Sequence, residues 1–331
     1  MAEVVLSNLS KAFGTTQAVS DVTMTIPDGA FVVLLGPTGA GKTTMLRLIA
    51  GLESPDKGDV RIDGASVLAD TPAQRDVAMV FQQYSLYPHL TVRDNLAFPL
   101  RSPVLNVPEA EIARQINEVA SVLHIDHKLD NKATQLSGGE MQRVSIGRAL
   151  VRNPRIYLMD EPLSSLDAKL RAELRVELKR IHAEMNATFL YVTHDQIEAM
   201  TMASHIGVLD RGRLVQFGTP REIYDNPVNL YVATRLGQPR INVLPASAFA
   251  GGPASAAQIG LRPEHIALGE GQPATIRRVE HLGDQTRLHL EMGPHSLITL
   301  TDPHTRQAAG ENVYIHPRNP LWFDASGSRV A

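Results

Sequence analysis

The segment GPTGAGKT, residues 36–43, constrains the fold more than any other part of the sequence. It fits the pattern G-x-x-x-x-G-K-[ST] and lies between the apolar run FVVLL (31–35) and the helical pattern TTMLRLIAG. A glycine-rich loop between a buried strand and a helix exposes backbone N–H groups that can surround phosphate groups. The sequence therefore predicts an α/β fold with a P-loop that binds a nucleoside triphosphate.

Two side chains of this loop have expected roles in nucleotide binding. In such a loop Lys42 reaches the β- and γ-phosphates, and the Thr43 hydroxyl completes the shell of a bound Mg²⁺ ion. A flexible glycine turn without a ligand is the structural alternative, and the strand–loop–helix setting disfavours it. We therefore expect a triphosphate and Mg²⁺ as ligands.

Further short apolar runs alternate with helical patterns through the first two thirds of the chain. Runs of this kind predict strands that are buried on both faces of a mostly parallel sheet. They are VAMVF (77–81), RIYLMD (155–160), TFLYVT (188–193) and HIGVLD (205–210). The stretch 166–185 predicts a helix, because its apolar residues recur at spacings of four and three.

Two of the predicted strands end in polar residues that suit nucleotide chemistry. Asp160 and Glu161 end one strand, and His194 follows another, where an open α/β sheet holds its ligands. Asp160 can hold Mg²⁺ through water, and Glu161 can orient or deprotonate an attacking water molecule. A neutral His194 imidazole can donate a hydrogen bond near the γ-phosphate. The alternatives are an acid pair that caps the next turn and a histidine with a structural role.

Length and composition predict two domains. The chain has 331 residues, which exceeds the usual ~100–200 per domain. Residues 91–152 show helical periodicity, and Thr91 with Asp94 resembles a capping box at the start of this insertion. We therefore assign residues 1–235 to the α/β domain. Residues 236–331 begin with a Gly-, Pro- and Ala-rich linker and continue as short alternating runs, which predict a small all-β domain.

Charge and hydropathy exclude several classes of function. The net charge is -3, and the segment after residue 240 has no lysine, seven arginines and eight acids, so it lacks the basic groove of a nucleic-acid binder. The absence of cysteine excludes disulfides. The N-terminal residues lack the pattern of a signal peptide, and no apolar run approaches the ~20 residues of a membrane span. We therefore expect any membrane association to be peripheral.

The segment QLSGGEMQR (135–143) adds a second candidate for anion binding. Its serine and two glycines precede a helical pattern, so a hydroxyl, free N–H groups and the positive end of a helix dipole come together. This signature segment, the P-loop and the strand-ending acids together resemble the ATP-binding cassette (ABC) ATPases. GPTGAGKT resembles Walker A of that family, IYLMDE Walker B, LSGGEMQR the signature and SSLD (164–167) the D-loop.

The resemblance implies which residues contact ATP and Mg²⁺. Phe13 in KAFG corresponds to the aromatic residue that stacks on adenine, and Gln82 to the Q-loop glutamine. The implied ATP contacts are Phe13, Gly36, Pro37, Thr38, Gly39, Ala40, Gly41, Lys42, Thr43, Thr44, Gln82, Ser137, Gly138 and Gly139. Thr43, Gln82 and Asp160 are the implied Mg²⁺ residues, and Lys42, Glu161 and His194 the implied catalytic ones, with His194 as the switch histidine.

The resemblance is closest to the ATPase subunits of bacterial sugar importers. QQYSLYPHLTVRDNLAFPL, EPLSSLDAKLR and THDQIEAMTMA match that group, and GLRPEHI (260–266) and VEHLGDQT (279–286) resemble its C-terminal OB-like domain, known as TOBE. The implied protein is a peripheral ATPase on the cytoplasmic face of an inner membrane. It drives uptake of a carbohydrate-type solute, such as a sugar, polyol, glycoside or glycerol-phosphate, through two permease subunits fed by a periplasmic solute-binding protein.

The resemblance also implies a dimer. In the family, ATP lies between two subunits, so Ser137, Gly138 and Gly139 of one copy face the γ-phosphate held by Lys42 of another copy or a homologue. The segment around Gln82 is the implied contact for the permease, with Tyr84, Leu86, Tyr87 and His89 as an aromatic-rich patch. The alternative for these four side chains is that they pack the base of the helical insertion.

The sequence departs from the family pattern at three positions. Phe13 stands where Tyr or Trp is frequent, Ala40 where Cys is frequent, and Glu140 where the signature often has Gln. A phenyl ring can still stack on a base, though with less area than an indole. The linker and the β domain are also shorter than in the longer relatives, so we transfer no regulatory contacts.

Other functional classes fit the sequence less well. A soluble ABC ATPase of translation or DNA repair is the alternative function, but such proteins carry two cassettes or a long coiled coil, and this chain has one P-loop and no long heptad run. A small-molecule P-loop kinase acts without a signature segment. An exporter is disfavoured by the lack of membrane spans.

Overall fold

The computed structural model describes residues 2–102, 107–185 and 187–330. Its contacts divide the chain into two compact units, Met1–Pro220 and Arg221–Ala331. The short helices α7 (Pro220–Asp225) and α8 (Leu230–Ala233) therefore fall almost wholly in the second unit. The boundary between the units thus precedes the change in composition at residue 236, where the sequence places it.

A six-stranded sheet forms the centre of the first unit, in the order β10-β9-β3-β8-β7-β6. The strands from β9 to β6 are parallel, and β10 pairs with β9 in the antiparallel sense. The five strands that the sequence predicts are all confirmed. They are β3 (Phe31–Leu35), β6 (Val77–Val80), β7 (Ile156–Asp160), β8 (Thr188–Thr193) and β9 (His205–Asp210), followed by β10 (Arg213–Gly218).

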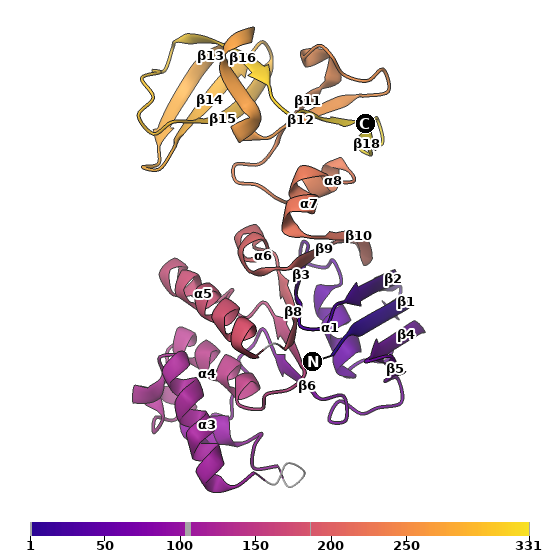
Figure 1. Ribbon diagram of the computed structural model, residues 1–331, viewed down its shortest axis with the longest axis vertical. Coiled ribbons are helices and arrows are strands. Elements are labelled where there is room, and N and C mark those ends of the chain that lie inside the picture. The colour runs from indigo at the N-terminus through magenta and orange to yellow at the C-terminus, as the bar shows by residue number, and fades with distance from the viewer. Residues whose placement is uncertain (1, 103–106, 186, 331) are drawn as a thin grey trace. The chain divides into compact units, whose positions relative to one another are not determined.

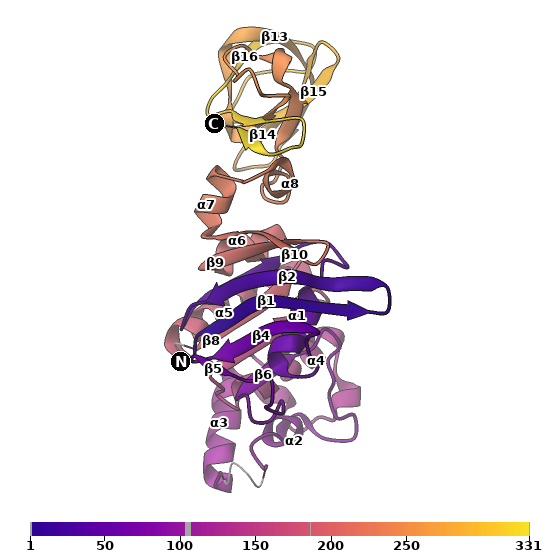
Figure 2. The same cartoon turned by 90° about the vertical axis from the view of Figure 1, so that its right-hand side faces the viewer.

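A second, antiparallel sheet of the first unit has the order β2-β1-β4-β5. Figure 2 looks onto this sheet. Its strands are β1 (Val4–Phe13), β2 (Thr16–Ile26), β4 (Lys57–Ile62) and β5 (Ala65–Ser66). Helix α1 (Lys42–Ala50) buries Met45, Leu46 and Ile49 in one core with residues of both sheets. The P-loop that precedes α1 is thereby fixed between the two sheets.

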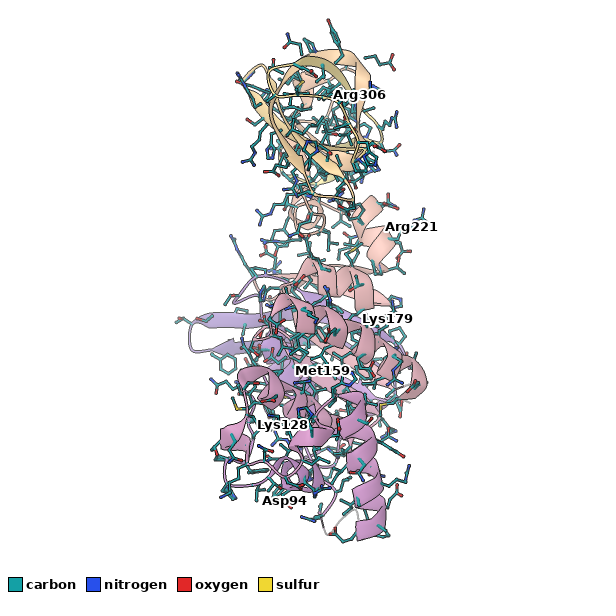
Figure 3. All side chains as sticks on the ribbon, turned by 90° about the vertical axis from the view of Figure 1, so that its left-hand side faces the viewer. Asp94, Lys128, Met159, Lys179, Arg221 and Arg306 are labelled. Atoms are coloured by element: carbon teal, nitrogen blue, oxygen red, sulfur yellow. The ribbon has the colours of Figure 1, made fainter. Side chains whose placement is uncertain are left out.

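The predicted helical insertion contains α2 (Val92–Ala97), α3 (Glu109–Val122) and α4 (Gly138–Leu150), with two short 3-10 turns, η1 (Asp126–Lys128) and η2 (Ala133–Gln135). Thr91 caps α2, and its hydroxyl oxygen accepts a hydrogen bond from Asp94 N at 3.1 Å. Asp94 in turn accepts from the Thr91 hydroxyl at 2.7 Å. Figure 3 shows Asp94 and Lys128 in this helical part of the unit.

Two helices cover the central sheet beside the insertion (Figure 1). The predicted helix is confirmed as α5 (Ala168–Met185), which buries Leu174, Leu178 and Ile181. Helix α6 (Gln196–Met202) packs beside it, and Lys179 of α5, labelled in Figure 3, donates a hydrogen bond to Thr201 O at 2.8 Å.

The second unit is mainly β structure, as the sequence predicts. One sheet has the order β11-β12-β17-β18 and the other β15-β14-β13-β16. Trp322, which is 8% exposed, packs in the core that the two sheets share, and the large aromatic is therefore a core residue. The strands are β11 (Asn242–Pro245), β12 (Gln258–Leu261), β13 (Ile266–His281), β14 (Thr286–Met292), β15 (His295–Thr301), β16 (Asn312–Pro317), β17 (Leu321–Phe323) and β18 (Arg329–Val330).

Candidate active site

The P-loop folds around the side chain of its own lysine. Lys42 is only 6% exposed, and its Nζ donates hydrogen bonds to Gly36 O at 2.9 Å and to Pro37 O at 3.1 Å. Gly41 has φ +94°, and a Cβ atom at this position would lie 2.2 Å from Ala18 O. Only glycine fits there, so the close approach of β2 to the loop depends on that residue.

Burial and two nearby carboxylates set the charge balance around Lys42. Burial lowers the pKa of the Lys42 ammonium, and Glu161 and Asp160 oppose that effect. The nearer carboxylate oxygen, Glu161 Oε1, lies 3.6 Å from Nζ. A half-desolvated ammonium that is held by carbonyl oxygens suits a phosphate, because the phosphate supplies a full counter-charge.

Asp160 and Thr43 meet at the end of β7. The Thr43 hydroxyl donates to Asp160 Oδ1 at 3.0 Å, and Asp160 is 4% exposed. Burial raises the pKa of Asp160, with a further contribution from Glu161. A hydroxyl and a carboxylate side by side are the oxygen ligands that Mg²⁺ prefers. The donor set therefore fits a magnesium ion, with Gln82 on the wall of a cavity that Thr43 also lines.

Glu161 contacts both of the other predicted catalytic residues. Its Oε1 faces Lys42, and its Oε2 lies 3.0 Å from His194 Nδ1. The backbone of Glu161 has φ +45°, which is uncommon for a residue with a side chain. Hydrogen bonds hold it there, because its N–H donates to Val192 O at 3.0 Å and its carbonyl accepts from the Ser164 hydroxyl at 2.9 Å. Backbone strain of this kind persists where the surroundings fix it, often at functional sites.

Lys42, Thr43, Glu161 and His194 share one cavity of about 520 Å³, which the predicted site residues Gly36, Pro37 and Asp160 do not line. Most of its walls come from residues that the sequence predicts to contact ATP or to act in catalysis, and Thr16 and Ala18 of β2 are additional. These two residues are spaced for one face of a strand, and that alternation just after Phe13 was the only signal for them in the sequence. The lining residues are Thr16, Ala18, Thr38, Gly39, Ala40, Gly41, Lys42, Thr43, Thr44, Gln82, Glu161 and His194.

Phe13 lies at the end of β1, where it pairs with Thr16 of the cavity wall. Its side chain is 46% exposed, and Lys11 Nζ lies 5.3 Å from the ring centroid. Phe13 itself does not line the cavity. An exposed ring beside the cavity leaves apolar area on which a base can stack.

The signature segment begins helix α4 but does not line this cavity. Ser137 is the N-cap, and Glu140 completes a capping box by accepting from Ser137 N at 2.8 Å. That hydrogen bond, together with Lys128 at 3.1 Å, lowers the pKa of Glu140 to about 2. Glu140, in place of the frequent Gln, thus stabilises the turn that presents Ser137 and Gly138.

A smaller groove of about 300 Å³ lies beside the segment after Gln82. Tyr84 and Leu86 of the predicted aromatic patch line it, together with Met141 of α4. Tyr87 instead packs within the insertion, because its ring centroid lies 4.4 Å from that of Phe98 and its N–H donates to Asn95 Oδ1 at 2.9 Å. The packing alternative therefore holds for Tyr87.

Comparisons with known proteins match both units. A family model described as "ABC transporter" matches residues 19–164, and one described as "TOBE domain" matches residues 259–323. The sn-glycerol-3-phosphate import ATP-binding protein UgpC of Ruegeria pomeroyi is 44% identical over 95% of this chain and 93% of its own. The lactose transport ATP-binding protein LacK of Rhizobium radiobacter is 40% identical over 100% of both chains.

The first unit also matches solved structures. The dimeric structure of MJ0796, a bacterial ABC transporter cassette, is 32% identical and covers 66% of this chain and 99% of its own, with a TM-score of 0.61. A second structure of that cassette, a dimeric post-hydrolysis state bound to ADP and Pi, is also 32% identical, with a TM-score of 0.60.

Proposed function

This chain belongs to the ABC transporter family and is an ATPase of that family, and we propose that it powers import of a carbohydrate-type solute by closing, as a dimer, around ATP. The proposal is based on the position of Glu161, which lies between Lys42 and His194 in one cavity. This arrangement places a general base beside the groups that would hold a γ-phosphate.

Residues in the cavity and next to it have separate roles in ATP binding and hydrolysis. Lys42 and the N–H groups of the P-loop bind the β- and γ-phosphates, and Phe13 stacks on the adenine. Thr43, Asp160 and Gln82 would hold Mg²⁺, which neutralises charge on the phosphates when bound. Glu161 orients the attacking water and accepts its proton. His194 donates one hydrogen bond, to Glu161 in the structure described and to the γ-phosphate when ATP is bound.

The dimer part of the proposal concerns Ser137, Gly138 and Gly139. An anion site at the start of α4 that does not line the cavity of its own chain is available to the nucleotide of a second copy. ATP would then bind the closed dimer more tightly than the open one and so favour closure. Hydrolysis would remove that difference in affinity. The dimeric cassette to which the first unit is similar supports this arrangement.

We propose two integral-membrane permeases as further partners, and a periplasmic solute-binding protein as an indirect one. The apolar groove lined by Tyr84, Leu86 and Met141 is the surface that we assign to a permease. Among the described residues, no helix has the length and the apolar character that a membrane crossing needs. We place the chain on the cytoplasmic face of the inner membrane through these partners.

The names of the relatives support a carbohydrate-type solute, because one imports sn-glycerol-3-phosphate and another transports lactose. The test is co-purification of the tagged chain from membranes, followed by ATPase assays of the complex with solute-loaded binding protein. We expect permeases in the complex and a rate that rises with the cognate solute. Recovery of the chain without membrane partners would favour the alternative, a soluble ABC ATPase.

A further inference from the structure

Arg171, near the start of α5, makes contacts that the proposed chemistry does not use. Its Nη2 donates to Leu166 O at 2.9 Å and approaches Ser164 O at 3.5 Å. Its Nη1 lies 3.7 Å from Asp195 Oδ2. One guanidinium thus joins the segment after Glu161 to the residue after His194.

Asp195 fixes the direction in which the chain leaves His194. It is the N-cap of α6, and its Oδ1 accepts from Ile197 N at 2.7 Å and from Glu198 N at 3.4 Å. The other oxygen, Oδ2, is the one that faces Arg171. The N–H of Asp195 donates to the Thr193 hydroxyl at 2.9 Å. A shift of Asp195 would therefore turn the backbone that carries the His194 imidazole.

The segment Ser164–Asp167 is tied to Glu161 in a similar way. Ser164 donates to Glu161 O through its N–H at 3.2 Å and through its hydroxyl at 2.9 Å. The same segment reaches the signature helix, because the Ser165 hydroxyl donates to Gln142 Oε1 at 3.3 Å. Arg171 is a side chain that contacts both this segment and the His194–Asp195 turn.

A purely structural role explains these contacts less well. The Arg171 and Asp195 side chains are 31% and 24% exposed, and partly exposed ion pairs contribute little to folding stability. Helices α5 and α6 are also joined elsewhere, by Lys179 and Thr201. The guanidinium instead directs separate N–H groups at the two loops in a fixed geometry, whereas the ammonium of a lysine is a single compact group without that geometry.

We propose that Arg171 is a positioning residue that couples the segment 164–167 to the His194–Asp195 turn and so holds the His194 imidazole against Glu161. This inference deepens the proposed function and rests on the roles that it gives to Glu161 and His194. Arg171 acts through His194 and touches no reacting atom.

The test compares five variants of the full chain with the wild type: Arg171→Ala, Arg171→Lys, Asp195→Asn, the double variant with Arg171→Ala and Asp195→Asn, and Lys179→Ala. Asparagine still caps a helix, so Asp195→Asn removes the charge that faces Arg171 and keeps α6. Lys179→Ala is the matched control, because it removes a contact between α5 and α6 that lies away from both loops. Measurements are kcat at saturating MgATP, the Kd of a fluorescent ATP analogue, and Tm.

We expect Arg171→Ala to lower kcat by about tenfold, because misplacement of a catalytic group by about 1 Å can cost about 100-fold. Asp195→Asn should lower kcat in the same direction, and the double variant should fall within about twofold of Arg171→Ala, because the two residues act as one unit. The Kd of the analogue and Tm should stay near the wild-type values, and Lys179→Ala should retain its kcat. Arg171→Lys should recover only part of the rate.

Three outcomes would overturn the inference: an unchanged kcat in Arg171→Ala, an equal loss in Lys179→Ala, or effects of Arg171→Ala and Asp195→Asn that multiply in the double variant. Glu161→Gln is measured in parallel. If Glu161→Gln hydrolyses ATP normally, the proposed catalytic site is wrong. If Glu161→Gln is inactive while Arg171→Ala behaves as wild type, the proposed catalytic site stands and only the proposed coupling by Arg171 is wrong.

Discussion

Glu161 Oε2 and His194 Nδ1 lie 3.0 Å apart, although the two residues follow different strands. Their strands, β7 and β8, are parallel neighbours, so their carboxyl ends meet at the same edge of the sheet. Lys42, at the start of α1, approaches the other oxygen of the same carboxylate. The three side chains therefore converge because each follows one of the parallel neighbours β3, β7 and β8, whose carboxyl ends lie at the same edge of the sheet.

Glu161→Gln should separate ATP binding from hydrolysis. Glutamine retains the size of the side chain but cannot accept a proton, so we expect kcat to fall by about 100-fold or more. ATP affinity should persist, and the variant should accumulate as a dimer with ATP, as measured by phosphate release and size-exclusion chromatography. Glu173→Gln, an exposed change in α5, is the control. Wild-type turnover in Glu161→Gln would remove this residue from catalysis.

Asp160→Asn should stabilise the nucleotide-free chain while it impairs hydrolysis. Burial raises the pKa of Asp160 above its unfolded value, so its ionised form costs stability at neutral pH, and that cost disappears as the pH falls through the folded pKa. Asparagine can still accept from Thr43 without the charge. We expect Tm at pH 7 to rise by a few degrees, for a gain of roughly 1 kcal/mol. A lower Tm at pH 7 would contradict the argument.

Glu140→Gln tests the departure from the frequent signature residue. The folded pKa of Glu140 is about 2, below its ordinary value of 4.5, so its contribution to stability is fully present above pH 4.5 and is lost as the pH falls toward 2. Gln can keep the hydrogen bond from Ser137 N but loses the attraction to Lys128. We expect a loss of about 1 kcal/mol at pH 7. The difference in Tm between wild type and variant should shrink below pH 4.5, and a difference that grows there would contradict the assignment.

Phe13→Ala should weaken ATP binding without affecting the P-loop. An aromatic stacking contact contributes about 0.5–1.5 kcal/mol, so Kd should rise by roughly threefold to tenfold. Phe13→Trp should bind more tightly than wild type, because an indole offers more area. Leu52→Ala, an equally exposed apolar change, is the control. Equal Kd values for all three variants in a fluorescence titration would exclude Phe13 from the base site.

The fold and the centre of the site could be predicted because they depend on local patterns. β3, β7 and β8 are buried along their whole length, so their residues form continuous apolar runs. The roles of Lys42 and Thr43 follow from a loop whose geometry depends on its own glycines. In each case the residues that define the feature are neighbours in the sequence.

The remainder depends on contacts between distant segments. Thr16 and Ala18 reach the cavity only through the register of the β1–β2 hairpin. The Tyr87 ring lies against Phe98, and the Asn95 side chain holds the backbone of Tyr87. The spacing of apolar residues in the sequence does not indicate either contact. The link from Arg171 to Asp195 joins α5 to the N-cap of α6, and β8 separates these helices in the sequence, so only the folded chain brings the two side chains together.

In the proposed mechanism the dimer closes with the signature segment of one copy on the P-loop of the other. Because the chain has no cysteine, single cysteines can report this contact. One copy carries Thr38→Cys, in the exposed part of the P-loop, and a differently tagged copy carries Ser137→Cys, which is nearly isosteric; both carry Glu161→Gln.

The measurement is the yield of disulfide-linked dimer between the two tagged copies after mild oxidation, with and without MgATP. Disulfides form only where the two Cα atoms come within about 7 Å, so a bond requires the proposed contact. We predict a linked dimer that carries both tags and forms only with ATP. A yield that ATP does not change, or a bond within one chain when both cysteines are placed in the same copy, would contradict closure across the dimer.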